Sequence, residues 1–355
     1  MVVYDSTYNP PYFLRNGVAM TAYTAFQAGR NWETSIPYPE PLYQQVIFTG
    51  GQGVPIFGWV AIPKNAHSTI VGTYGITGEL EQQWFLRLMG CKAYSQGYAV
   101  VLFDWRAHGK TTELSPTLTS DGLYEGEDFV RISAEAAKMG CPNKFWFTGY
   151  SLGGQLALWG IKAAVDLGIK GIDVAGGAVI CPSLDSLRSL TYLVTTPFGK
   201  YVEPRIAGQL KKLARKIHEH HPGHFDEAAI ERANSIWGFD EELVIGRLGF
   251  SSVAEYYEAS NGLNILTQLQ KPTLILYAAD DPLFHPGIVP DLKITSSQNP
   301  SIDLLLTRYG GHVGYVSSKK CQYQNQDPDQ WWAWNRILQW IEQRQRHKVE
   351  LVSSF

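Results

Sequence analysis

The chain has 355 residues, 45% of them hydrophobic, which is enough to fill the core of one large domain with an insertion or of two domains. Its formal net charge is −3, and charges of both signs are spread along the sequence. It therefore lacks the global basic field with which proteins bind nucleic acid, and we expect a globular protein that has no nucleic-acid partner.

The four cysteines stand far apart and form no C-x-x-C pair, which argues against a zinc site and against a disulfide framework. The first residues lack a basic stretch followed by an apolar one, and no apolar run reaches the ~20 residues that a membrane span needs. We predict reduced thiols and a cytoplasmic protein, either soluble or peripheral to a membrane.

Two runs of β-forming residues, 44–50 and 54–63, flank a glycine-rich turn and predict a hairpin. Beyond them, short apolar runs alternate with longer helical patterns, which is typical of a mostly parallel α/β sheet with helices on both faces. The apolar runs lie at 69–75, 98–105, 143–150, 173–181, 272–280 and 302–310.

Between residues 183 and 269 the strand patterns stop and helical ones take over, for example at 205–217 and 251–260. We predict that 183–269 is a helical cap inserted into a core domain. The core domain is formed by residues 1–182 and 270–355 and ends in a helix predicted at 329–343.

A serine stands where a predicted strand passes directly into a helical pattern, in the G-x-S-x-G pattern Gly149-Tyr150-Ser151-Leu152-Gly153. A tight strand-to-helix turn leaves no room for flanking side chains, so glycines fit there while the serine is held above the sheet. The amides that begin the helix favour negative charge nearby. We interpret Ser151 as a nucleophile, although a glycine-rich turn with an idle serine has the same pattern.

A serine needs a base to take its proton, and the base needs an acid to orient it. In folds of this type the acid follows a late strand and the histidine follows the last strand. Asp280 ends the run at 272–280 and Asp281 follows it directly, while His312 follows the run at 302–310. The order predicts a triad, but strand periodicity does not choose between the two aspartates.

Two backbone amides are expected to stabilise the oxyanion that forms on the substrate. One belongs to the residue after the nucleophile, Leu152, and the other to the loop after the third strand. That loop reads Thr73-Tyr74-Gly75-Ile76-Thr77-Gly78, and Ile76 is the predicted donor.

Several stretches together resemble the α/β-hydrolase superfamily and, within it, the YheT-like and EMB-type hydrolases. They are PPYFLRNGVAMT, GYSLGG, FDEELVIGRLGFSSVAEYYEAS, KPTLILYAADDPLF, GGHVGY and WWAWNRILQWI, which span nearly the whole chain. The resemblance implies an α/β-hydrolase fold, a triad of Ser151, Asp281 and His312, and hydrolysis of carboxylic esters, often of acyl lipids. Related hydrolases place the acid three residues after a small residue that closes the strand, and Ala278 then points to Asp281.

The sequence departs from the family pattern at two places. Tyr74-Gly75 stands where the oxyanion loop usually begins His-Gly, and Asn16-Gly17-Val18 replaces an N-G-H pattern. The first change leaves the backbone donor in place, so we expect it to affect rate and substrate range rather than reaction type.

The predicted function is hydrolysis of medium- or long-chain acyl esters, with a small-molecule or lipid ester as substrate and no cofactor. The aromatic residues of the cap favour an apolar acyl pocket. Thioester hydrolysis or acyl transfer by the same residues stays open, as does a protein of this fold that binds an acyl ligand without catalysis.

Three other patterns are weighed against this function. In the segment 218–224, only His220 and His224 have the spacing of a helical zinc pair, and a Pro-Gly pair interrupts them, so we predict no metal site. His108 is a rival base, but it precedes the serine. The cationic face at 211–216 of a cap helix predicts ordinary packing, with weak contact to an anionic membrane as the alternative.

Overall fold

The computed structural model describes residues 2–4 and 7–353. Within these ranges nine strands form one sheet in the order β1-β9-β8-β7-β6-β4-β5-β3-β2. The predicted hairpin is confirmed as β2 and β3, which pair antiparallel, and β3 is also antiparallel to β5. All other neighbours are parallel. The strands are β1 (Val2–Tyr4), β2 (Gln44–Thr49), β3 (Pro55–Ala61), β4 (Ser68–Thr73), β5 (Tyr98–Phe103), β6 (Lys144–Tyr150), β7 (Asp173–Ile180), β8 (Thr273–Ala278) and β9 (Ile302–Thr307).

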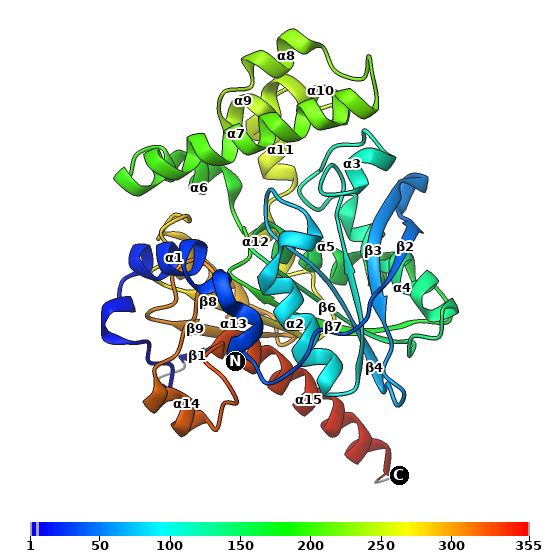
Figure 1. The fold of residues 1–355 in the computed structure, drawn as a ribbon, viewed down its shortest axis with the longest axis vertical. Helices are drawn as coiled ribbons and strands as arrows, with labels where there is room; N and C mark the ends of the chain where they lie inside the picture. The colour runs from blue at the N-terminus through cyan, green and yellow to red at the C-terminus, as the bar shows by residue number, and fades with distance from the viewer. Residues whose placement is uncertain (1, 5–6, 354–355) are drawn as a thin grey trace.

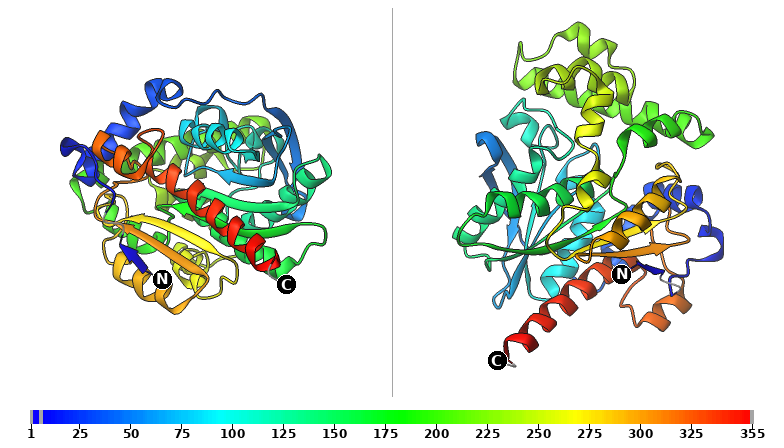
Figure 2. Two further views of the ribbon diagram at one scale, coloured as in Figure 1. Left: turned by 90° about the horizontal axis from the view of Figure 1, so that it is seen from below. Right: turned by 180° about the vertical axis from the view of Figure 1, so that it is seen from behind.

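Helices cover both faces of the sheet, which explains why the central strands are continuous apolar runs rather than alternating ones. Every residue of β4, β5 and β8 is buried. On one face lie α2 (Trp84–Ser95) and α15 (Trp332–Ser353), joined by aromatic contacts such as Phe85 with Trp334. On the other lie α4 (Glu125–Lys138), α5 (Leu152–Leu167), α12 (Gly262–Leu266) and α13 (Ile288–Gln298). In the left view of Figure 2, α15 runs diagonally across the molecule.

Between β7 and α12 the chain forms a group of helices above one edge of the sheet, at the top of Figure 1. Their apolar residues form a second cluster that is separate from the main core. This second cluster contains Phe225, Phe239 and Tyr256. The helices are α6 (Ser186–Leu193), α7 (Pro197–His220), α8 (Glu227–Arg232), α9 (Ile236–Phe239), α10 (Ile245–Leu248) and α11 (Val253–Ala259), and a π-helical turn, η5 (Asp240–Val244), follows α9.

The cap helix α7 begins well before the predicted position 205. Thr196 caps it by accepting a hydrogen bond from the Gly199 amide, and Pro197 occupies the first turn, where a missing N–H costs nothing. Pro204 lies inside the helix. The remaining elements are α1 (Gly17–Phe26), α3 (Thr111–Leu114), α14 (Lys319–Asn325) and the 3-10 turns η1 (Tyr12–Leu14), η2 (Ala28–Ser35), η3 (Gly51–Gly53) and η4 (Leu80–Gln82).

Within residues 2–4 and 7–353, no helix has the length and the apolar composition needed to cross a membrane. The four cysteines are free and buried.

Because β6, β8 and β9 run parallel, their carboxyl ends meet at the sheet edge below the cap helices. Ser151 follows β6, the two candidate aspartates follow β8, and His312 follows β9. The topology thus brings together residues that are far apart in the sequence.

Candidate active site

Ser151 lies at the turn between β6 and α5 in a backbone conformation that L residues rarely adopt, with φ 55° and ψ −131°. Backbone hydrogen bonds hold it there: its amide donates to the Ile180 carbonyl over 3.0 Å, and its carbonyl accepts from the Ser183 amide over 3.1 Å. Strain of this kind persists only where the surroundings fix it, and here they fix a serine at the end of the sheet.

Both flanking glycines are required by close backbone approach. A Cβ on Gly149 would lie 2.2 Å from the Gly153 carbonyl oxygen, and a Cβ on Gly153 would lie 2.2 Å from the Tyr74 carbonyl oxygen. Any side chain at these positions would force the strand, the helix and the neighbouring loop apart, so the spacing of the G-x-S-x-G pattern has a direct steric cause.

The structure brings Ser151, His312 and Asp281 into one chain of hydrogen bonds. His312 Nε2 lies 2.9 Å from Ser151 Oγ, and His312 Nδ1 lies 2.8 Å from Asp281 Oδ2. A neutral imidazole with its proton on Nδ1 makes this arrangement, because it donates to the carboxylate and accepts from the hydroxyl. The other carboxylate oxygen of Asp281 accepts from the Leu283 amide over 2.9 Å, which fixes its orientation.

Asp280 points to a different part of the loop. Its Oδ1 accepts from the Gly311 amide over 2.9 Å, and its Oδ2 is buried with no hydrogen-bond partner among the described residues. Burial raises the pKa of this carboxyl to about 6. Asp280 therefore supports the loop that carries His312 and does not contact the imidazole.

The helix α1 supports the same loop, a contribution that the sequence interpretation missed. The Thr21 hydroxyl accepts from the His312 amide over 2.8 Å. At the start of α1, a Cβ on Gly17 would lie 1.7 Å from the Asp280 carbonyl oxygen, so only glycine fits. Asn16 caps the helix through its side chain. The signal in the sequence was the Asn16-Gly17 pair, which matches the first two residues of the family's N-G-H pattern, whereas Val18 departs from it.

The two predicted oxyanion donors belong to segments that adjoin Ser151. Leu152 begins α5, where the first amides have no partner within the helix. The loop that carries Ile76 packs directly on the nucleophile, since a Cβ on Gly75 would lie 2.9 Å from Ser151 Cβ. In the part of the chain that the structure describes, no hydrogen bond occupies the Ile76 amide.

The comparison with known proteins decides the family. A model of the Alpha/beta hydrolase family matches residues 83–319, more than half of the chain. The chain belongs to the alpha/beta hydrolase family. Its fold is similar to that of the Pyrococcus furiosus esterase Pf2001, with a TM-score of 0.51 and 16% identity, covering 83% of this chain and 93% of the other.

Relatives of this α/β hydrolase place it near the group that its motifs resemble. It is 53% identical over 349 residues to slr0264 of Synechocystis sp., a protein provisionally named an esterase, with 95% of each chain covered. It is 25% identical to mouse phospholipase ABHD3, over 74% of this chain and 62% of the other. Escherichia coli YheT and Picea glauca EMB8 are also similar, so the resemblance to YheT-like and EMB-type hydrolases is confirmed.

Tyr74, which replaces the usual histidine of the oxyanion loop, is fully buried and ties the loop to Asp104. Its hydroxyl donates to Asp104 Oδ1 over 2.5 Å. The same carboxyl accepts from the Leu80 amide over 2.7 Å and from the Lys110 amide over 2.9 Å. Asp104 therefore holds both ends of the loop, although burial raises its pKa to about 6.

His108 also supports the oxyanion loop. Its Nε2 accepts from the Thr77 amide over 3.0 Å, and its Nδ1 donates to the Arg106 carbonyl over 3.1 Å. Burial lowers its pKa to about 3, so the ring is neutral and Nε2 stays an acceptor. Trp105 stacks on the ring at 3.5 Å. The structure thus places this rival base against the residue that follows Ile76, and it is His312 that contacts Ser151.

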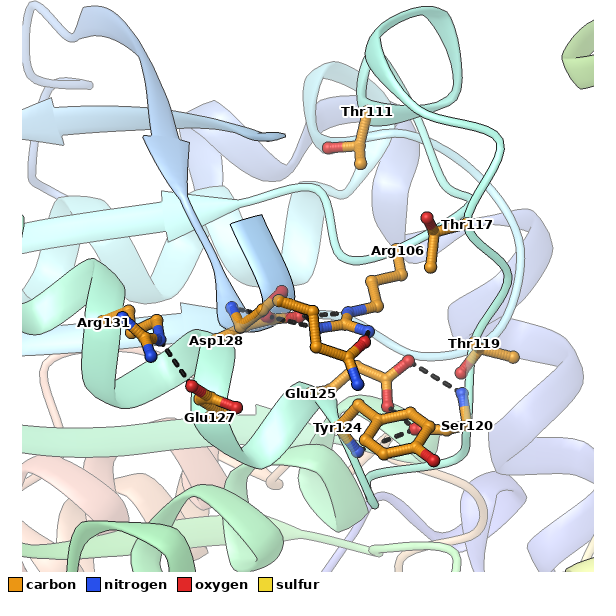
Figure 3. Close-up of polar contacts among 12 residues, drawn as sticks. Arg106, Thr111, Thr117, Thr119, Ser120, Tyr124, Glu125, Glu127, Asp128 and Arg131 are labelled. Atoms are coloured by element: carbon orange, nitrogen blue, oxygen red, sulfur yellow. Dashed lines mark hydrogen bonds and ion pairs between the residues drawn. The ribbon is translucent and has the colours of Figure 1, made fainter. Parts of the chain in front are cut away.

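Two sets of buried polar contacts, shown in Figure 3, attach the segment between β5 and α4 to the helix α4. His108 belongs to this segment. Arg106 donates to both carboxylate oxygens of Asp128 over 2.8 and 2.9 Å. Glu125 accepts from the Ser120 amide and hydroxyl and from the Gly122 amide. The segment between β5 and α4 is therefore held at both ends, and the helix α3 within it packs against the cap helix α7.

Two apolar hollows meet at Ser151. The first runs beneath the cap and includes the buried residues Leu193, Leu210, Ile236 and Phe239. The second lies between α1 and α7 and includes Phe85, Phe198, Phe26 and Tyr201, of which the last two are 58% and 49% exposed. Both share Ile76, Ile206 and Leu283. The candidate nucleophile thus stands between a covered space and one that reaches the surface.

The histidines of segment 218–224 make separate contacts. His220 contacts the Lys216 carbonyl, His221 the Thr112 carbonyl, and His224 the Arg247 side chain. Over residues 2–4 and 7–353, no group of three or more potential ligands is placed to hold a metal ion.

Proposed function

We propose that this α/β hydrolase is a serine esterase that cleaves carboxylic esters of medium- or long-chain acyl groups. The observation that carries the proposal is the hydrogen-bonded chain from Ser151 through His312 to Asp281, at 2.9 and 2.8 Å, where two apolar hollows meet. The provisional esterase name of the relative that shares 53% identity supports it.

The geometry suits acyl transfer in two steps. Ser151 Oγ forms a bond to the ester carbonyl carbon while its proton passes to His312 Nε2, and Asp281 stabilises the resulting imidazolium. The amides of Leu152 and Ile76 donate to the oxyanion. The C–O bond to the alcohol breaks as His312 returns the proton to the leaving oxygen, and water then releases the acid by the same route.

The covered hollow suits the acyl chain because its walls are buried apolar side chains of the cap and core. The second hollow reaches the surface beside exposed Phe26 and Tyr201, so the alcohol product can leave there. This division predicts that chain length on the acyl side determines catalytic efficiency.

The test is a series of p-nitrophenyl esters from acetate to palmitate with purified protein, and with Ser151→Ala as the blank. We expect kcat/KM to rise from acetate to a maximum at a medium or long chain. A large preference for acetate would contradict the lipid-like substrate, and hydrolysis retained in the alanine variant would contradict the serine mechanism.

Contact of the cap with an anionic membrane stays a prediction. Its cationic face is partly neutralised, because Lys211 and Arg215 pair with Glu231, and Lys216 pairs with Glu113. Surface pairs of this kind reduce the charge available to lipid headgroups. Co-sedimentation with phosphatidylserine vesicles at low salt measures the contact, and protein left in the supernatant would exclude it.

A further inference from the structure

The covered hollow beneath the cap is apolar along most of its wall but contains a group of buried polar side chains that the proposed mechanism does not use. Asp121, Asp240 and Ser189 line it and are 8%, 7% and 4% exposed. They come from three separate elements: the loop before α4, the π-helical turn η5 and the helix α6. An unbranched alkyl chain would give these groups nothing to bind.

Asp121, one member of the group, lies beside α5 and beyond Ser151. Gln155, one helical turn beyond Ser151, donates to the Asp121 carbonyl over 2.7 Å and to the Ser260 carbonyl over 3.0 Å. One turn is a rise of about 6 Å. Asp121 is thus reached by a substituent several bonds from the ester carbonyl and not by the carbonyl itself, and Asp240 interacts with Asp121 electrostatically.

One member of the group, Ser189, lacks a hydrogen-bond partner for its side chain among the described residues. Its hydroxyl is buried. Buried hydroxyls are nearly always paired in folded proteins, so an exception that lines a ligand hollow indicates a missing partner. Asp240 has one partner in Tyr257, whose hydroxyl donates to Oδ2, and α11, which carries Tyr257, packs against α6.

The two carboxyls lie in an acidic surrounding. Burial is the largest cause of the raised pKa at both, and the next cause is in each case another acid: Glu125 at Asp121, and Asp121 at Asp240. Glu125 also holds the backbone on both sides of Asp121, whose φ is 50°. Burial and the neighbouring acid thus favour the neutral form of each carboxyl, and a bound N–H or O–H donor would favour the charged form instead.

We propose that the covered hollow takes an acyl group that carries a hydrogen-bond donor, a hydroxyl or an ammonium group, and that Asp121, Asp240 and Ser189 bind this donor. The assignment rests on the proposed esterase function, because it places the acyl side of the ester in this hollow. It changes the expected substrate from a plain fatty acyl ester to a substituted one.

The test compares three sets of p-nitrophenyl esters with the full-length protein: linear acyl groups of four to ten carbons that end in methyl, hydroxyl or ammonium. At the length that reaches the polar group, the hydroxyl- or ammonium-ended ester is expected to exceed its methyl-ended counterpart in kcat/KM by about tenfold or more.

Three variants locate the effect and identify the donor. Ser189→Ala removes a hydroxyl that lacks a partner, so it should fold and should lower the preference for the hydroxyl-ended ester severalfold. Asp240→Leu should reverse the preference toward the methyl-ended ester. Asp121→Asn keeps the shape but removes the charge, so it should lower kcat/KM for the ammonium-ended ester far more than for the hydroxyl-ended one. Glu241→Leu is the matched control, because Glu241 lies next to Asp240 but is exposed and outside the hollow.

The outcomes separate this inference from the function on which it rests. If methyl-ended esters are hydrolysed and no donor-bearing ester is preferred at any length, the inference is wrong and the esterase function stands. If no ester of any set is hydrolysed, the esterase function itself is wrong. A preference that survives in Ser189→Ala and Asp240→Leu would place the donor elsewhere and overturn the assignment.

Discussion

The sheet edge and the cap contribute to the candidate site in different ways. At the sheet edge, parallel strand ends set Ser151, Asp281 and His312 at hydrogen-bond distances, and glycines at fixed positions allow close backbone approach. The cap contributes walls from its own apolar cluster and, with the loop before α4, the acidic pair Asp121 and Asp240. In the proposed function, the sheet edge therefore provides the catalytic groups and the cap selects the acyl group.

The comparison predicts that substitutions at the sheet edge lower turnover for every ester, whereas substitutions in the cap change the ratio between esters. Ser151→Ala should have the largest effect, a loss of about 10⁴-fold or more in kcat for all substrates, because the proposed mechanism forms the acyl-enzyme on the Ser151 hydroxyl. Steady-state kinetics on a short and a long ester measure it. A loss of turnover confined to one ester would contradict the assignment of catalysis to the sheet edge and of acyl selection to the cap.

Substitutions of the two adjacent aspartates test which of them orients the histidine. Asp281→Asn should lower kcat by about 10³- to 10⁴-fold, because an amide at this place favours the wrong tautomer of the histidine. Asp280→Asn should lower it by about tenfold or less, since Asp280 contacts the Gly311 amide and not the imidazole. Thermal melting curves control for folding. Losses in the reverse order would reassign the acid.

His108 should act through the oxyanion loop as a positioning residue. His108→Ala removes the acceptor of the Thr77 amide and should lower kcat by about 10- to 100-fold while KM changes little. His108→Gln keeps an acceptor oxygen and should recover part of the loss. If both variants changed KM rather than kcat, His108 would belong to substrate binding instead.

The smallest predicted effect concerns stability. The folded pKa of Asp280 is raised to about 6 by burial, so its stabilising contribution is complete below the unfolded pKa and is lost as pH rises through the folded value. Between pH 4 and pH 7.5, the free energy of unfolding should therefore fall by up to about 3 kcal/mol more in the wild type than in Asp280→Asn. Urea unfolding at the two pH values measures the difference, and equal losses would contradict the buried carboxyl.

The parallel sheet and the α/β-hydrolase family were predictable because short sequence patterns indicate them. Apolar runs ended by glycine or aspartate mark the strand ends, and parallel strands bring these ends to one edge, so the strand order places Ser151 near His312. β1 was missed because Val2–Tyr4 is too short to give a pattern. The start of α7 was missed because Pro204 lies inside the helix.

The supporting contacts could not be predicted because they depend on tertiary contact. His108 is visible in the sequence as a rival base, but its use by the Thr77 amide follows from how the oxyanion loop packs. The same holds for the use of Asp104 by the Tyr74 hydroxyl. Asp121 stands in a polar loop, and Asp240 stands in the cap stretch FDEELVIGRLGFSSVAEYYEAS, whose resemblance to the family assigns it no role. Only the tertiary fold brings both carboxyls to one hollow.

The most direct test of the central claim is covalent labelling of Ser151. Purified protein is treated with a fluorophosphonate, digested, and sequenced by mass spectrometry. The account predicts one adduct, on Ser151 of the GYSLGG segment, and none in Ser151→Ala. An adduct on another residue, or labelling that persists in the alanine variant, would contradict the assignment of Ser151 as the nucleophile.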